Sequence, residues 1–372
     1  MKSLDKYIGC LLGGAAGDAL GYEVEFLDEA DIFSRFGNRG ITEYVLKDGK
    51  AQISDDTQMT LFTATGLLLG TANGVAQGAA YIDCINHSYK DWYRTQTEAY
   101  PLSGEPHYSW LVNLSELFYR RAPGITCLSA IESDTLGTIE APINSSKGCG
   151  GIMRVAPIGL YFDGTSCTGS AADMIGAQAA ALTHGHSLGY IPAAALVHII
   201  RLIVHDNMTI FEAVKDMKNS ISVQFADDKH LNEFLQLIDK AVLLAQDEQA
   251  DDLEAIRALG EGWVAEETLA IAIYCCLKHS NNFEKAVVAA VNHSGDSDST
   301  GAVTGNIVGA YLGFKEIPDK YLDSLELKDV VIDIATDLYN DYRLPEGNSG
   351  SNEQWTKKYI ESSYSPYQNR QY

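Results

Sequence analysis

Positive charge is scarce in this 372-residue sequence. Lys and Arg number 27 against 50 Asp and Glu, which gives a formal net charge of −23 at pH 7. Nucleic-acid backbones and anionic membranes are bound through clustered Lys and Arg side chains. We therefore expect neither nucleic acid nor a membrane as a partner. Divalent cations remain compatible with the composition, because they take carboxylate ligands.

A disulfide framework and long apolar runs are also missing. The seven Cys are odd in number and form no CxxC pair. Cys275 and Cys276 are adjacent in an apolar helical run, as reduced core residues would be. No segment reaches the ~18 consecutive apolar residues of a membrane span. The opening MKSLDKYIGCLLGGAAGDALG begins like a signal peptide, but Asp18 and Glu23 follow too soon for one. These absences favour a cytoplasmic protein.

Strand-like alternation is limited to short pieces such as residues 41–46, and helical periodicity dominates. Apolar residues recur at spacings of three and four in seven segments. These are residues 58–70, 171–184, 190–206, 210–219, 229–247, 264–279 and 283–292. Residues 95–150 are the least regular part of the chain. The pattern predicts one compact, all-α, multi-helix domain over residues 1–344 and a polar, peripheral C-terminal tail over residues 345–372.

Two segments carry glycine at every fourth position. The glycines are Gly9, Gly13, Gly17 and Gly21 in the first segment and Gly301, Gly305, Gly309 and Gly313 in the second. Residues four apart lie on one face of a helix, so each segment presents a groove without side chains. An interior glycine costs a helix ~1 kcal/mol relative to Ala. Because only close backbone packing compensates for this cost, we expect the two stripes to pack against each other.

Paired carboxylates lie at the start of two helical segments. Asp55 and Asp56 precede the helix QMTLFTATGLLLG, and Asp296 and Asp298 precede the second glycine stripe. One interpretation is helix capping, because Asp55 and Gln58 have the spacing of a capping box and acids suit a helix N-terminus. Capping uses one oxygen per helix, however, and each of these helix starts carries two acids with neighbouring hydroxyl groups.

The other interpretation of the paired acids is a metal site. Four carboxylates with flanking Ser and Thr hydroxyls are an all-oxygen ligand set of the kind that hard divalent cations prefer. If the two helix starts converge, repulsion between the carboxylates would be severe without cations between them. Two metal ions ~3.5–4 Å apart would relieve it and give the geometry of bimetallic hydrolytic sites. The spacing alone leaves capping and metal binding open.

The middle of the chain holds a glycine loop and a pair of His residues. In NSSKGCGGIMRVAPIGL, Gly148, Gly150 and Gly151 allow a backbone path that points N–H groups at an anion. The loop lacks the Walker P-loop pattern, and an ordinary glycine turn fits as well. His184 and His186 have no third His or Cys at zinc-ligand spacing. We therefore expect one His to contact a ligand and the other to lie at the surface.

Glu23 and Glu25 follow the first glycine stripe in LGYEVEF. In a strand or loop both carboxylates would lie on the same face. Either could be a general acid or base, and a solvated surface Glu is the ordinary alternative.

Five motifs occur in the order in which the ADP-ribosylglycohydrolase family has them, and the chain resembles that family over residues 5–315. The motifs are GGAAGDALGYEVEF, SDDTQM, KGCGGIMRVAPIGL, LTHGH and NHSGDSDSTGAVTG. The chain is similar to the dinitrogenase reductase-activating glycohydrolases. The resemblance implies a compact all-α fold around a centre of two Mg²⁺ or Mn²⁺ ions. It also implies hydrolysis at C1 of the distal ribose, which releases ADP-ribose from a modified protein side chain. Arginine is the expected acceptor by resemblance to the bacterial branch, and serine, a nucleobase or free ADP-ribose derivatives stay open.

The resemblance also assigns roles to particular residues. Metal ligands would be Ser54, Asp55, Asp56, Asp296, Asp298 and Ser299. The acid/base carboxylate would be Glu25 rather than Glu23, with metal-bound Asp55 or Asp56 as the other candidates for handling the proton. Substrate contacts would come from Ser146, Lys147, Gly148, Cys149 and Gly150 at the diphosphate, chiefly through backbone N–H groups, and from His184 near the ribose or adenine.

Three features depart from the family's pattern. Ser54 and Ser299 stand where Thr is common, a mild change because the hydroxyl group remains. Cys149 stands where many members have Asn, which affects the substrate contacts expected there. The tail after Leu344 has no family counterpart, and it prompts the hypothesis of immunity to an ADP-ribosylating toxin, with a cognate ADP-ribosyltransferase as partner.

Two other functions fit the same residues. A different two-metal hydrolase, such as a phosphoesterase, could use the same acids. A non-enzymatic member could bind and block an ADP-ribosyltransferase. Retention of all four Asp residues argues against lost chemistry but is compatible with a blocking role alongside it.

Overall fold

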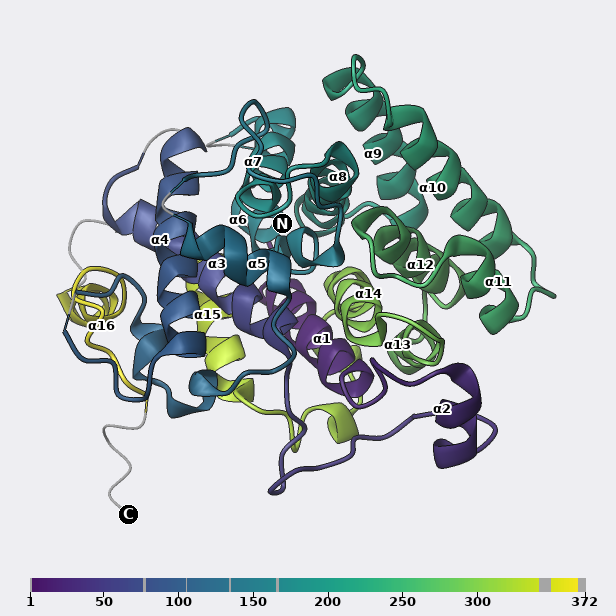
Figure 1. Ribbon diagram of the computed structural model, residues 1–372, viewed down its shortest axis with the longest axis horizontal. Coiled ribbons are helices and arrows are strands. Elements are labelled where there is room, and N and C mark those ends of the chain that lie inside the picture. The colour runs from purple at the N-terminus through teal and green to yellow at the C-terminus, as the bar shows by residue number, and fades with distance from the viewer. Residues whose placement is uncertain are drawn as a thin grey trace.

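The computed structural model is built of helices (Figure 1). It describes residues 2–75, 78–104, 106–133, 135–164, 167–340 and 349–366. Those residues form 16 α-helices and several short 3₁₀ helices, and among them β-pairing is confined to isolated bridges. The all-α fold predicted from the hydrophobic periodicity is therefore confirmed.

The long connections between α-helices of the described residues run over 37–54, 98–124, 133–155 and 313–327, and the 3₁₀ helices lie in the last three of these. The α-helices are α1 (Leu4–Gly21), α2 (Glu29–Phe36), α3 (Asp55–Ala72), α4 (Gly78–Thr97), α5 (Ile125–Glu132), α6 (Ala156–Tyr161), α7 (Gly169–Ala181), α8 (Ser187–His205), α9 (Ile210–Gln224), α10 (Leu231–Gln246), α11 (Asp252–Leu259), α12 (Ala265–Lys278), α13 (Phe283–Val291), α14 (Ser297–Leu312), α15 (Lys328–Asn340) and α16 (Ser349–Tyr359). The 3₁₀ helices are η1 (Trp110–Asn113), η2 (Ser115–Phe118), η3 (Cys149–Gly151), η4 (Phe314–Glu316) and η5 (Asp319–Tyr321).

Each of the seven segments with helical periodicity contains a helix of similar extent. In chain order these helices are α3, α7, α8, α9, α10, α12 and α13. The strand-like piece over residues 41–46 forms no strand and runs as a loop. A single strand leaves its backbone N–H and C=O groups without partners, so alternation alone does not produce one.

Helices α1 and α14 lie side by side at the centre of the fold (Figure 1). Their glycines face each other as Gly9 with Gly309, Gly13 with Gly305 and Gly17 with Gly301. A methyl group added at any of these six positions would overlap a backbone carbonyl group of the opposite helix. The expected packing of stripe against stripe is confirmed, and it brings the two helix axes closer than side chains would allow.

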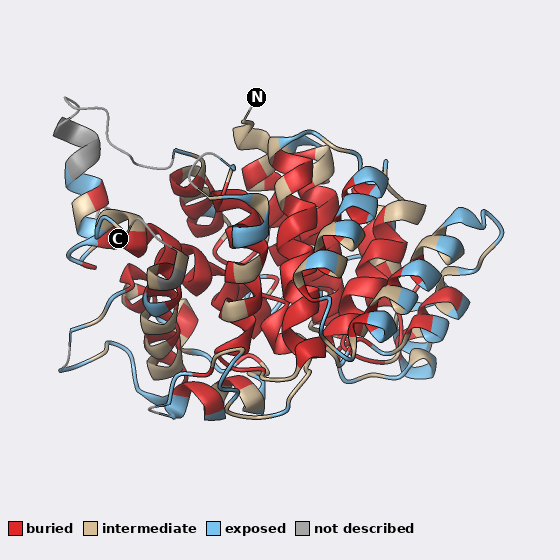
Figure 2. Ribbon diagram, turned by 90° about the horizontal axis from the view of Figure 1, so that it is seen from above, coloured by how far each residue is buried: buried red, intermediate tan, exposed pale blue. Residues whose placement is uncertain are grey.

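Helix α8 lies in the core of the protein. Among the described helices, it is the one that is long and apolar enough to cross a membrane by length and composition, with a mean hydropathy of 1.7. The same stretch is 94% buried inside the fold, against α6, α7 and α9. Figure 2 shows such buried residues in red through the central helices and exposed residues on the outer ones. The apolar surface of α8 is therefore covered by the protein itself.

The C-terminal segment packs against the body of the protein. The predicted boundary between residues 344 and 345 lies outside the described residues. Beyond it, α16 contacts α3, and its Lys358 is buried. The Lys358 Nζ donates to Asp333 Oδ1 and to Asp337 Oδ2 of α15, each at 2.7 Å. The Tyr359 hydroxyl donates to Asp337 Oδ2 at 2.6 Å. The described part of the polar tail is thus attached to the body through buried charge.

The glycine contact makes a prediction about stability. Replacing Gly305 by Ala should lower the free energy of unfolding by about 2–4 kcal/mol, because an overpacked backbone contact must open. The matched control is Gly124→Ala, where φ is −58° and an added methyl group meets Cys127 Sγ at 4.0 Å. Urea unfolding followed by circular dichroism measures both variants. Equal urea midpoints for Gly305→Ala and Gly124→Ala would contradict close packing of α1 on α14.

Candidate functional site

The site forms where the last turns of α1 meet the start of α3. Asp18 of α1 is fully buried, and its carboxylate accepts hydrogen bonds from the Ser54 N–H at 3.0 Å, from the Thr57 N–H at 3.1 Å and from the Thr57 hydroxyl. Asp18 therefore fixes the start of α3 against α1. No role is predicted for Asp18 from its motif. The only sequence signal is a single ionisable residue amid Gly, Ala and Leu in GGAAGDALG.

The first pair of acids lies buried at the start of α3. Ser54 is the N-cap, and its Oγ accepts from the Asp56 N–H at 3.2 Å. The Asp55 N–H donates to the Arg121 carbonyl at 3.0 Å, and Asp55 Oδ2 accepts from the Gly124 N–H at 3.2 Å. This segment is thus held by the loop that precedes α5 as well as by α1.

The capping box suggested for Asp55 and Gln58 is absent. Ser54 caps α3 instead, and the Gln58 side chain turns to the irregular region. Its Nε2 donates to the Tyr119 carbonyl at 3.1 Å, and its Oε1 accepts from the Trp92 indole at 3.0 Å. Capping therefore accounts for neither carboxylate at the start of α3.

The second pair of acids lies buried at the start of α14. Asp296 is the N-cap, and its Oδ1 accepts from the Ser299 N–H at 3.2 Å. Asp298 Oδ1 accepts from the same N–H at 2.9 Å. The other Asp296 oxygen accepts from the Cys149 thiol at 2.7 Å. Capping thus explains part of this arrangement and leaves further carboxylate oxygens available.

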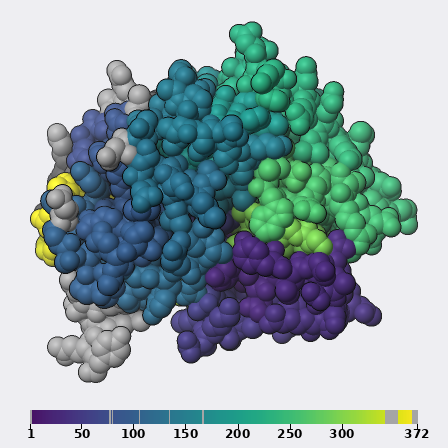
Figure 3. Space-filling model, viewed as in Figure 1, coloured from purple at the N-terminus to yellow at the C-terminus, as the bar shows by residue number. Residues whose placement is uncertain are grey.

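The two helix starts share one acid cluster. Burial raises the pKa of Asp56 and Asp298 well above the usual range, and each is raised further by neighbouring carboxylates, including Asp56 acting on Asp298. Burial likewise raises the pKa of Asp55, with Asp18 and Asp296 adding to the effect. The nearby cations pair elsewhere, Lys147 with Glu266 and Arg121 with Glu326. On one face of the molecule the regions that supply the cluster meet, coloured purple, teal and green in Figure 3. Among the described residues, the acids of this cluster thus form no ion pair with a basic side chain.

Glu23 and Glu25 lie in a turn after α1 and do not share a face, unlike the strand or loop arrangement considered above. Glu23 forms surface ion pairs with Arg35 and Lys47. Glu25 is buried, and its Oε2 has no hydrogen-bond partner. Burial first, and then the charges of Asp296 and other acids, raise the pKa of Glu25 to about 9. Of the two, Glu25 is the one that faces the acid cluster.

The oxygens of this cluster could hold divalent cations. Asp56 Oδ2 and Glu25 Oε2 are both buried without a hydrogen-bond partner. Buried polar atoms are normally satisfied by protein, water or an ion. In the described part of the chain, no three His, Cys, Asp or Glu side chains already converge on one point. Rotation of the carboxylates would therefore accompany metal binding. The carboxylate and hydroxyl donors fit a hard cation better than zinc.

The glycine loop lies beside the acid cluster. Besides the thiol contact to Asp296, the Cys149 N–H donates to the Trp263 carbonyl at 3.2 Å. The Gly148 N–H donates to Ser146 Oγ at 3.3 Å. Of the backbone N–H groups expected to face a diphosphate, these two already have protein partners. The loop is thus placed at the cluster, and its contacts to a substrate stay a prediction.

His184 supports the loop from behind. Its ring packs under Gly148 and Gly150, where added methyl groups would press against it. Burial and the Arg154 charge lower the pKa of His184 to about 3, so the ring is neutral, and its Nδ1 lies 2.8 Å from Thr183 Oγ1. His186 is half-buried and caps α8. The predicted contact between His184 and a ligand is therefore compatible only with a neutral ring.

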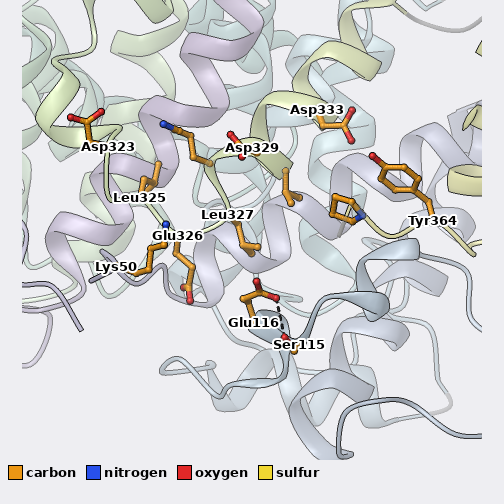
Figure 4. Close-up of a pocket in the computed structure, with 13 residues that line it drawn as sticks. Lys50, Ser115, Glu116, Asp323, Leu325, Glu326, Leu327, Asp329, Asp333 and Tyr364 are labelled. Atoms are coloured by element: carbon orange, nitrogen blue, oxygen red, sulfur yellow. Dashed lines mark hydrogen bonds between the residues drawn. The ribbon is translucent and has the colours of Figure 1, made fainter. Parts of the chain in front are cut away.

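Arg121 and Glu326 form a buried ion pair behind Asp55. Glu326 Oε1 accepts from Arg121 Nη2 at 3.4 Å, and Glu326 Oε2 accepts from the Ile53 N–H at 3.2 Å. Glu326 also lines a pocket of about 670 Å³, next to Leu325 and Lys50 (Figure 4). The two residues of the pair therefore hold the backbone at Ile53 and Asp55, just before and at the start of α3. No sequence pattern connects residues 121 and 326.

A family model described as ADP-ribosylglycohydrolase matches residues 1–348 of this chain. The chain belongs to the ADP-ribosylglycohydrolase family. Among its relatives, the ADP-ribosyl-(dinitrogen reductase) glycohydrolase of Rhodospirillum rubrum is 25% identical, over 87% of this chain and 91% of that protein. ADP-ribosylhydrolase ARH3 of Bos taurus is 23% identical, over 87% and 90%. An ADP-ribosylarginine hydrolase of Serratia proteamaculans is 24% identical, over 93% and 81%.

A solved structure agrees with the fold. It is that of an ADP-ribosylglycohydrolase-related protein complex, with a TM-score of 0.55 and 24% identity, over 91% of this chain and 98% of that one. Family membership and the names of the relatives indicate a glycohydrolase that acts on ADP-ribosylated substrates. The all-α architecture is thus the architecture of the ADP-ribosylglycohydrolase family.

The buried ion pair of this glycohydrolase gives one prediction. Glu326→Leu should lower the free energy of unfolding by about 3–5 kcal/mol, because it leaves the Arg121 guanidinium buried and unpaired. The double variant Arg121→Met/Glu326→Leu should lose less free energy of unfolding than Glu326→Leu alone. Urea unfolding of the wild type, both single variants and the double variant closes the cycle. Additive losses would show that the pair is not coupled.

The acid cluster gives a prediction about pH. Glu25 and its neighbouring Asp residues have folded-state pKa values above their unfolded values, so the folded glycohydrolase binds more protons than the unfolded chain. The contribution of these groups to stability is then full below their unfolded-state pKa values and is lost as pH rises through their folded-state pKa values. In EDTA, the Tm should fall by about 3 °C or more between pH 7 and pH 9. Differential scanning calorimetry measures the Tm, and in Glu25→Gln the Tm should change less between pH 7 and pH 9. A Tm that rises over this range would contradict the buried cluster.

Proposed function

We propose that the protein is a divalent-metal-dependent hydrolase that removes ADP-ribose from arginine side chains. The observation that carries the proposal is the gathering of Asp55, Asp56, Asp296 and Asp298, all buried, at two helix starts in a chain of the ADP-ribosylglycohydrolase family. Repulsion among buried carboxylates is costly unless cations or protons neutralise them. The arginine acceptor is supported by the name of the Serratia relative, an ADP-ribosylarginine hydrolase.

The metal ligands proposed are the six residues predicted from the sequence. They are Ser54, Asp55, Asp56, Asp296, Asp298 and Ser299, all of them buried. Two Mg²⁺ or Mn²⁺ ions bound there would supply Lewis-acid assistance and orientation for the substrate ribose and a water molecule. Asp18 and Arg121 act on this ligand set indirectly, because they fix the backbone of residues 54, 55 and 57.

Glu25 is the residue proposed to handle the proton. Cleavage of the bond at C1 requires an acid that protonates the leaving group. With its pKa raised to about 9, Glu25 carries a proton at neutral pH in the metal-free protein, and its unpartnered Oε2 faces the acid cluster. The loop from Ser146 to Gly150, supported by His184, would hold the diphosphate beside this cluster. A cognate ADP-ribosyltransferase, a role in toxin immunity and a cytoplasmic location stay predictions.

The test is release of ADP-ribose from an arginine-ADP-ribosylated protein. Release should require Mg²⁺ or Mn²⁺ and stop in EDTA. Asp55→Ala and Asp298→Ala should each lower the rate at least about 100-fold, since even indirect partners of a metal commonly contribute 10–100-fold. The matched control is Asp227→Ala, an exposed acid in the loop after α9, which should keep the wild-type rate.

Other outcomes point to the alternatives. Absence of release by folded, metal-loaded protein would reject arginine as the acceptor, and serine-linked and nucleobase-linked ADP-ribose would then be tested. Turnover of phosphate esters alone would identify a phosphoesterase. Inactivity on every substrate, together with inhibition of an ADP-ribosyltransferase, would identify a blocking protein.

A further inference from the structure

Two exposed aromatic rings are stacked on each other at the surface. Phe26 is 72% exposed and Trp263 is 40% exposed. Their ring centroids are 6.1 Å apart, and their planes differ by 25°. Phe26 belongs to the turn after α1, and Trp263 belongs to the loop before α12. The pair therefore joins two separate segments of the chain.

The pair lies at the edge of the acid cluster, with one ring from each side. Phe26 directly follows Glu25, which is buried and turned toward the cluster. On the other side, the Trp263 carbonyl accepts from the Cys149 N–H, and the Cys149 thiol contacts Asp296. Gly262, next to Trp263, lies against the start of α14, where an added methyl group would overlap Thr300 Cγ2 at 2.7 Å and contact Asp296 Cβ at 3.5 Å. A group attached to a substrate held at the cluster would thus pass these rings.

The chemistry of this edge favours a planar cation. The face of an aromatic ring carries partial negative charge and attracts cations, and guanidinium groups stack on such faces. The exposed Glu261 lies two residues before Trp263 and adds negative charge beside the rings. A phosphate group would be repelled here, and a neutral serine linkage would gain nothing from the rings. An ADP-ribosylated arginine keeps a charged, planar guanidinium next to the bond at C1.

We propose that Phe26 and Trp263 form the subsite for the acceptor side chain, where they stack on the guanidinium of ADP-ribosylated arginine. The proposal rests on the proposed function, because it takes the acid cluster as the place where the ribose is bound. The rings act on recognition of the acceptor, while the acids and the glycine loop bind the ADP-ribose. An adenine ring is the rival ligand for the pair, since it also stacks on aromatic side chains.

The experiment compares a substrate that carries the guanidinium with a ligand that lacks it. ADP-ribosyl-agmatine is the substrate, and ADP-ribose is the competitive inhibitor. Phe26→Ala and Trp263→Ala should each raise the KM for ADP-ribosyl-agmatine about five- to twenty-fold, the range of a cation–π contact at a partly covered site. The Ki of ADP-ribose should stay within about twofold of the wild-type value. ADP-ribose has no guanidinium group, so it does not make the cation–π contact that the variants lose.

Two further variants control the measurement. Trp263→Phe keeps an aromatic face, so its KM should stay close to the wild-type value. Phe211→Ala removes a ring of α9 that is 48% exposed and lies outside the cluster, and it should leave the KM unchanged. Thermal unfolding of each variant shows that it is folded before its kinetics are compared.

The outcomes separate this subsite from the proposed function. Wild-type turnover of ADP-ribosyl-agmatine with unchanged KM in Phe26→Ala and Trp263→Ala would overturn the subsite alone. A Ki for ADP-ribose that rises in parallel with the KM would assign the rings to the adenine instead. Lack of turnover by the metal-loaded wild type would overturn the arginine acceptor first and the subsite with it.

Discussion

The site depends on one constraint, which is the direct backbone contact between α1 and α14. Because glycine faces glycine along this contact, the two helix backbones touch directly, and side chains of any size would separate them. The register places the start of α14 beside the end of α1, where Gly21 meets Ser297. Asp18, one turn earlier on α1, then fixes the start of α3. Two helix starts that are far apart in the sequence are thereby held at one point.

The cost of this arrangement is electrostatic. Carboxylates at Asp55, Asp56 and Asp298 are withdrawn from water and face one another, and burial and mutual repulsion both disfavour their charged forms. The N-termini of α3 and α14 offset part of this cost through their dipoles and free N–H groups. A fold optimised for stability alone would replace such acids by apolar residues. These buried acids therefore lower the stability of the fold rather than add to it.

The sequence predicts the parts of this structure that have a local period or a local motif. Hydrophobic spacing locates α7, α8 and α10 to within a few residues, and the fourfold glycine spacing predicts the contact of α1 with α14. The contributions of Asp18, Trp263 and the Arg121–Glu326 pair are not predictable in this way. Each acts through a tertiary contact with a residue far along the chain, and a single sequence contains no pattern for such contacts. Conversely, a local spacing can predict a feature that the structure lacks. Asp55 and Gln58 have the spacing of a capping box, but Ser54 caps α3 and the Gln58 side chain bonds to the Tyr119 carbonyl.

The buried Lys358 has a consequence for how this protein can change over evolution. Its ammonium group lies between the Asp333 and Asp337 carboxylates, so loss of Lys358 would leave the buried Asp337 carboxylate inside the fold without its cation. Substitution at residue 358 is therefore tied to substitution at residue 337, whereas Asp333 is partly exposed. Among close homologues, the identity of residue 358 should vary in step with the acids of α15, and α16 should be inherited with α15 as a single unit.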